Sequence, residues 1–152
     1  MVTAKSDGGR AGDDGPIHAR LSDLGLVWLG GALGTTARYL LSEATPALSQ
    51  RPLVNFLINI GGAFLLGVLL TGLARAGSDQ AGRRALRLFA GTGFLGGFTT
   101  YSALAVDAAG LLDAGAVELA VAYALGTVLL GAAASMAGIA VASGSRGTGG
   151  RT

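Results

Sequence analysis

The sequence predicts an all-α integral membrane protein with four transmembrane helices. The 152 residues are 51% hydrophobic and only 13% charged, whereas an ordinary soluble domain has about 25% charged residues. The apolar residues gather into four blocks. Two of these blocks carry no charged side chain, so they lack the polar face that each helix of a soluble bundle needs.

Each block is long enough for a membrane helix, and short polar joints separate them. We place the blocks at about residues 24–41, 53–74 and 86–112 and between residues 118 and 146. The second block, at 1.5 Å per helical residue, reaches about 33 Å, which spans a hydrocarbon core of about 30 Å. The chain therefore divides into a mobile polar tail (1–22), a four-helix domain (23–142) and a flexible tail (143–152).

The basic residues predict a single orientation in the membrane. With four spans, the two tails and the joint between the second and third blocks lie on one side, and they carry nine of the eleven lysines and arginines. Arg38 and Arg51 are left for the other side. Because cytoplasmic loops retain Lys and Arg, both termini are expected in the cytoplasm.

Composition also excludes several classes of function. The chain has no cysteine and one histidine, His18, which lies in the polar head. This removes disulfide scaffolds, cysteine metal sites and histidine-centred catalysis from the apolar part. We therefore expect no enzyme, and the small net charge of +2 gives no reason to expect a nucleic-acid partner.

The third block contains the most informative stretch, GTGFLGGFTTYS at residues 91–102. Each glycine inside a helix costs about 1 kcal/mol relative to alanine, and the threonine and serine hydroxyls compete for backbone hydrogen bonds. The stretch predicts a broken helix, whose free peptide groups must be packed within protein or line a watery cavity. The alternative is a kinked helix whose glycines only allow close helix packing.

Two further stripes of polar residues lie within the charge-free blocks. Asn55 and Asn59 are four residues apart on one face of the second block. Tyr123, Thr127 and Ser135 lie on one slanted row of the fourth block, together with Gly131. Each stripe is explained either by polar contacts between helices or by the lining of a pore with neutral hydrogen-bond donors for a small anion.

Three motifs in these blocks resemble the bacterial fluoride channels called Fluc or CrcB. The motifs are GGALGTTARY (30–39), LINIGGAFLLG (57–67) and GFLGGFTTYSAL (93–104). The resemblance implies a four-span subunit that forms an antiparallel, dual-topology-type dimer with two narrow fluoride pathways. It also implies a structural sodium ion at the dimer interface, held by carbonyls of the broken third helices.

Positions of the site follow from this resemblance, residue by residue. The sodium carbonyls fall on Gly96 and Thr99. The fluoride pathway falls on a set of polar residues in the second, third and fourth blocks: Asn59, Tyr101, Ser102, Tyr123, Thr127 and Ser135. Arg38 matches the arginine of the first motif, although an arginine that reaches the outer interface is an equally good explanation. Asp107 stands where the family usually has glutamate.

The chain departs from the family at several pathway positions. The third-helix pattern usually reads TTFSTF, and its two phenylalanines present positive ring edges to fluoride. Here those positions are Tyr101 and Leu104, and position 131 in the polar row is glycine. A chain with fixed orientation also needs a partner inserted the other way. We therefore expect a heterodimer in which a paralogous chain of opposite topology supplies the missing phenylalanines.

The resemblance implies passive, fluoride-selective conduction out of the cell, which lowers fluoride toxicity. One alternative is a small four-helix, proton-coupled drug exporter. Such an exporter needs a membrane-embedded acid, for which Asp107 is the only candidate. The other alternative is a membrane assembly protein that transports nothing and uses its polar residues for packing alone.

Overall fold

The computed structural model describes residues 17–45, 51–76 and 80–144. Within these ranges the chain is helical apart from short connections, and it contains no β-strand. Residues 1–16 and 145–152 of the two expected tails lie outside the described residues, as do residues 46–50 and 77–79 of two expected joints.

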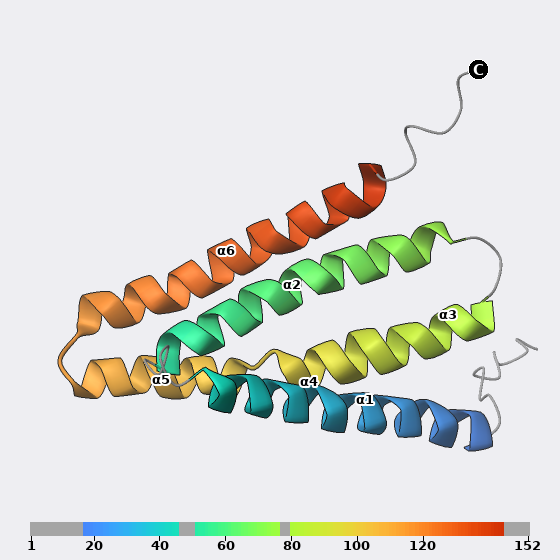
Figure 1. The fold of residues 1–152 in the computed structure, drawn as a ribbon, viewed down its shortest axis with the longest axis horizontal. Helices are drawn as coiled ribbons and strands as arrows, with labels where there is room; N and C mark the ends of the chain where they lie inside the picture. The colour runs from blue at the N-terminus through green and yellow to red at the C-terminus, as the bar shows by residue number, and fades with distance from the viewer. Residues whose placement is uncertain (1–16, 46–50, 77–79, 145–152) are drawn as a thin grey trace, which may run out of the picture.

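The described residues form four long helical segments, here called rods, and each rod runs in the opposite direction to the one before it (Figure 1). The first rod is α1 (Ile17–Ala44), the second is α2 (Arg51–Arg75) and the fourth is α6 (Val117–Gly144). The third rod is composed of four elements in line: α3 (Gln80–Leu86), the π-helix η2 (Arg87–Leu95), α4 (Gly96–Phe98) and α5 (Tyr101–Asp113). Helix α2 packs along α6, and α1 packs against η2 and α4.

The helical domain is longer at both ends than the sequence predicts. Helix α1 begins at Ile17, inside the segment expected to be a mobile tail, and α6 continues to Gly144. The expected joint between the third and fourth rods is observed at residues 114–116, where Gly115 has a φ of +75°.

Burial indicates a helical membrane protein. Two helices, Pro52–Arg75 and Val117–Gly144, are long and apolar enough to cross a membrane. Only 22% and 11% of their most apolar segments are buried, whereas the central helix of a soluble protein would be mostly buried. None of the described large side chains is fully buried, and Trp28, Leu129 and Met136 are more than 60% exposed. These apolar faces need lipid or a second protein against them.

Glycines allow the rods to approach closely. A Cβ atom on Gly34 of α1 would overlap the carbonyl oxygen of Phe94, and one on Gly93 would lie 2.9 Å from the Cα atom of Gly30. Gly67 and Gly138 play the same part between α2 and α6. Gly93 therefore allows close helix packing, as one of the two explanations of the glycine-rich stretch expects. The same stretch also has the irregular backbone geometry described next.

Candidate functional site

The third rod departs from α-helical geometry in two places, first as a π-helix and then as a short extended stretch. Its turns widen to π-helix over Arg87–Leu95 and return to α-helix over Gly96–Phe98. The chain is then extended at Thr99 (φ −77°, ψ 156°) and Thr100 (φ −151°, ψ 121°) before α5 begins at Tyr101. Figure 1 shows this short extended stretch between α4 and α5. Extended residues cannot continue the helical hydrogen bonds, so their peptide groups need other partners.

Asn59 of α2 supplies partners for both backbone groups of Thr100. The Thr100 N–H donates to Asn59 Oδ1 at 2.8 Å, and Asn59 Nδ2 donates to the Thr100 carbonyl at 3.1 Å. A side-chain amide carries one acceptor and two donors, so one N–H of Asn59 remains after this pair is formed. Helix α2 can approach the third rod closely because Gly62, one turn after Asn59, faces the Thr99 side chain.

The same arrangement releases two carbonyl oxygens of the third rod. In a continuous helix the Gly96 carbonyl would accept from the N–H of Thr100, which here donates to Asn59. The Thr99 carbonyl would accept from the N–H of Ala103, which here donates at 3.2 Å to the hydroxyl of Thr100, the N-cap residue of α5. These are the two carbonyls on which the family resemblance places the expected sodium ligands.

An open groove of about 440 Å³ runs beside the extended residues. It is lined from α2, the third rod and α6, and it brings together five of the predicted site residues: Asn59, Gly96, Thr99, Tyr101 and Thr127. The polar side chains of the described lining are four threonines, one asparagine and one tyrosine, and none of its side chains is charged. Such a lining offers neutral hydrogen bonds without a fixed charge.

A second polar cluster lies one helical turn away and includes an acid. Asp107 Oδ2 accepts from Asn55 Nδ2 at 2.6 Å and from the Tyr123 hydroxyl at 3.0 Å. All three side chains are half-buried. Two hydrogen bonds stabilise the carboxylate in apolar surroundings. From its spacing, Asn55 is expected to share one face of the second block with Asn59, and this position one turn before Asn59 is the signal for its role.

The remaining hydroxyls of the predicted pathway differ in their availability. The Thr127 hydroxyl donates to the Tyr123 carbonyl of its own helix at 2.7 Å, and the Tyr123 hydroxyl is occupied by Asp107. The Ser102 hydroxyl lies 3.0 Å from that of Thr100. Ser135 is half-buried on α6, outside the described lining of the groove.

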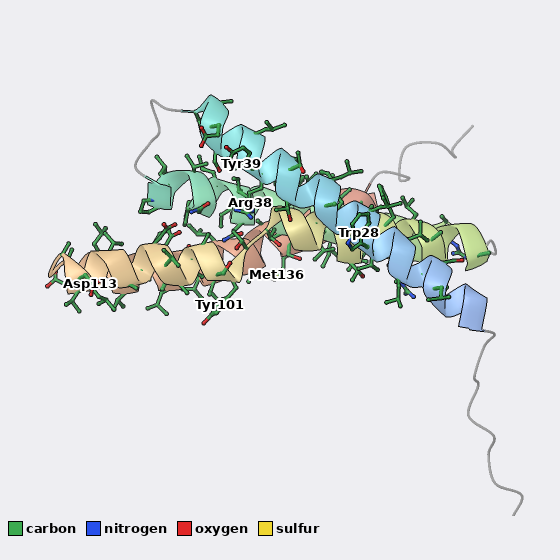
Figure 2. All side chains as sticks on the ribbon, turned by 90° about the horizontal axis from the view of Figure 1, so that it is seen from below. Trp28, Arg38, Tyr39, Tyr101, Asp113 and Met136 are labelled. Carbon is green, nitrogen blue, oxygen red and sulfur yellow. The ribbon has the colours of Figure 1, made fainter. Side chains whose placement is uncertain are left out.

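Tyr101 has an exposed side chain, and Arg38 has a buried donor that lacks a partner among the described residues. Tyr101 is 82% exposed and projects away from the helices (Figure 2), while Leu104, three residues on, is buried. The Nε atom of Arg38 is buried without a hydrogen-bond partner in the described part of the chain. An unpaired buried donor is costly, so this position favours a further contact.

Side chains of the described residues offer no conventional metal centre. No group of three or more His, Cys, Asp or Glu residues comes together among them. The oxygen donors best suited to a hard monovalent cation are the free carbonyls of Gly96 and Thr99, since unwound backbone carbonyls coordinate sodium in other membrane proteins.

These features define a helical membrane protein with an irregular third rod beside an uncharged polar groove. The chain belongs to the family described as CrcB-like protein, Camphor Resistance (CrcB), whose model matches residues 25–139. It is 53% identical over 126 residues to "Fluoride-specific ion channel FluC 2" of Leifsonia xyli subsp. xyli, covering 83% of this chain and 87% of that protein.

Two further relatives carry similar names. "Fluoride-specific ion channel FluC 1" of Cutibacterium acnes is 47% identical over 110 residues, which cover 72% of this chain and 77% of that protein. "Fluoride-specific ion channel FluC" of Phenylobacterium zucineum is 45% identical over 119 residues, covering 77% and 92%. The family assignment agrees with the resemblance that the three motifs predict.

Proposed function

We propose that this chain is a subunit of a fluoride-selective passive ion channel that exports fluoride from the cytoplasm and lowers its toxicity. The names of the relatives support fluoride as the transported ion. The observation that carries the proposal is the extended pair Thr99–Thr100, held by Asn59 at the edge of an uncharged polar groove. A channel that conducts rapidly needs binding weak enough for release, and neutral donors meet that need.

In the groove and beside it, the donors available to fluoride come from a few groups. The second amide N–H of Asn59 is free of the bonds to Thr100, and the hydroxyl of Ser102 lies beside the N-cap of α5. The hydroxyl of Thr127 becomes available by rotating away from its own helix carbonyl.

Fluoride is trapped in the cytoplasm when hydrogen fluoride enters and dissociates, so a selective leak is sufficient to lower its concentration.

A structural sodium ion fits the released carbonyls. Gly96 and Thr99 of two subunits would together supply four oxygen ligands, and the ion would hold the irregular segments of both subunits in place. Its positive charge would also lower the cost of bringing anions close. The chain's own contribution is to keep these carbonyls free of helical hydrogen bonds through Asn59 and Thr100.

We propose that the second subunit is antiparallel and is a paralogous chain of opposite topology. Support comes from the nine basic residues on one side against two on the other, from the unpaired Arg38 Nε and from the exposure of Tyr101. The numbered names FluC 1 and FluC 2 of two relatives agree with paired chains. All four rods then cross the cell membrane, with both termini in the cytoplasm.

Fluoride efflux from liposomes tests this proposal. Vesicles containing the protein and its partner should release fluoride to an external electrode when the membrane potential is relieved by a potassium ionophore, and they should retain chloride. The rate should not change when a proton gradient is imposed. A rate that follows the proton gradient would indicate an exporter that uses Asp107, and the absence of any ion release would indicate an assembly protein.

The partner requirement has a test of its own. This chain reconstituted alone should release little fluoride, and adding the paralogous chain should restore release. Robust efflux from this chain alone would refute the dependence on a partner and leave the channel assignment intact.

A further inference from the structure

A cleft at the basic end of the molecule has no part in the proposed fluoride pathway. It has a volume of about 870 Å³ and is lined by the last turns of α2 and the start of the third rod. These two segments lie at the same end of the molecule (Figure 1). Its described lining combines apolar residues with three arginines: Leu70, Leu73, Ala74, Ala81, Arg83, Arg84 and Arg87. No carboxylate belongs to this described lining.

The three arginines differ in how they are held. Arg83 reaches back to α2 and donates from Nη1 to the Leu73 carbonyl at 3.3 Å. Arg84 pairs with Asp23 of α1. Arg87 is exposed, and its side chain makes no hydrogen bond or ion pair with any residue in the described ranges. Asp23 therefore balances the charge of Arg84, while the charge of Arg87 in the cleft lining has no opposite charge paired with it among the described residues.

The cleft also has an apolar wall that continues along the membrane-crossing helix. Leu70 is 42% exposed and belongs, with Leu73 and Ala74, to the last turns of α2 before Arg75 ends it. The end of an apolar helix at a cluster of arginines marks the boundary between hydrocarbon and headgroups. One wall of the cleft therefore suits hydrocarbon and the other suits an anion.

We propose that this cleft binds an anionic phospholipid. Its phosphodiester would accept from Arg83 and Arg87, and an acyl chain would lie along Leu70 and Leu73. Basic pockets between transmembrane helices on the cytoplasmic side are known to hold anionic headgroups. A free anion would leave the apolar wall unfilled, and a zwitterionic lipid would bring a second positive charge to the arginines.

Native mass spectrometry of the full-length channel in detergent tests the proposal. Phosphatidylglycerol should be retained in preference to phosphatidylcholine, and inorganic phosphate should not displace it. Removing one arginine charge near a membrane surface lowers affinity about fivefold, and removing two lowers it roughly thirtyfold. We therefore expect these losses for Arg87→Gln and for the double variant Arg83→Gln, Arg87→Gln.

Arg75→Gln is the matched control. It makes the same change of charge at the same end of the molecule, but the Arg75 guanidinium donates to the Ala142 and Ser143 carbonyls of α6 and is not part of the described lining. Binding of phosphatidylglycerol to this variant should stay within twofold of the unsubstituted protein. Because Arg87 has no partner in the described ranges, Arg87→Gln alone should leave the fold intact.

Three results would overturn the proposal. Phosphatidylcholine bound as tightly as phosphatidylglycerol would remove the role of the arginines. Equal losses in Arg87→Gln and Arg75→Gln would indicate only a diffuse effect of positive charge at this end. Displacement of the lipid by inorganic phosphate would indicate a water-filled anion site instead.

Discussion

Replacing Asn59 with leucine tests whether this side chain holds the interruption of the third rod. Leucine has a similar size but makes neither of the two hydrogen bonds to Thr100, at 2.8 and 3.1 Å. An unsatisfied buried backbone group costs about 1–3 kcal/mol. Since Thr100 is half-buried, water can replace some of the lost hydrogen bonding. We therefore expect the free energy of local opening to decrease by about 2 kcal/mol.

Amide hydrogen exchange measures that loss directly. A decrease of about 2 kcal/mol in the free energy of opening corresponds to roughly thirtyfold faster exchange of the Thr100 N–H. Asn55→Leu is the control, because Asn55 donates to Asp107 and makes no hydrogen bond to Thr100. Exchange at Thr100 should therefore be unchanged in the control.

Asn59→Asp separates holding the backbone from lining the pathway. Its carboxylate still accepts from the Thr100 N–H, but it cannot donate to the Thr100 carbonyl or to fluoride, and its charge repels the anion. We expect fluoride efflux to be abolished in both Asn59 variants. If Thr100 exchanges in Asn59→Leu as slowly as in the unsubstituted protein, the holding role is refuted, and unchanged efflux would remove Asn59 from the pathway.

Three further predictions concern packing, the acidic cluster and sodium. Gly34→Ala should lower the thermal midpoint by several degrees, because overpacking against the Phe94 backbone costs about 1–3 kcal/mol. Gly25→Ala is the control and should leave the midpoint unchanged, because Gly25 has open space around it. Equal midpoints for the two variants would contradict the packing account. Asp107→Leu should destabilise the fold by about 2–4 kcal/mol because Asn55 and Tyr123 lose their acceptor, and an unchanged midpoint in chemical or thermal unfolding would show that the cluster contributes nothing. Replacing sodium with N-methylglucamine in all buffers should lower the midpoint reversibly, and no change on removing or restoring sodium would exclude a structural ion.

The helical rods follow from local patterns in the sequence. Long apolar segments without charge predict α2 and α6, and the observed Val117–Gly144 lies close to the expected limits of the fourth block. The start of α1 at Ile17 is not predicted, because a segment with several polar residues resembles a tail when its neighbours in space are unknown. The π-helical turns of Arg87–Leu95 also have no distinct local pattern.

The contacts of the candidate site depend on residues far apart in the chain. The sequence indicates Asn59 as a polar residue that must find a partner, but it does not show that its partner is the backbone of Thr100, 41 positions away. Likewise, Tyr123 is expected in a row with Thr127, yet its hydroxyl is directed to Asp107 on another helix. Helix spacing predicts which residues share a face, and only the packing of the rods determines what each face meets.

The reversal potential in a planar bilayer tests the central claim most directly. With the channel and its partner in the bilayer, a tenfold fluoride gradient and equal chloride on both sides, fluoride selectivity predicts zero current at about 59 mV, the equilibrium potential of a univalent ion. Zero current near 0 mV with the same gradient would mean that chloride passes as well, and it would contradict a fluoride-selective channel.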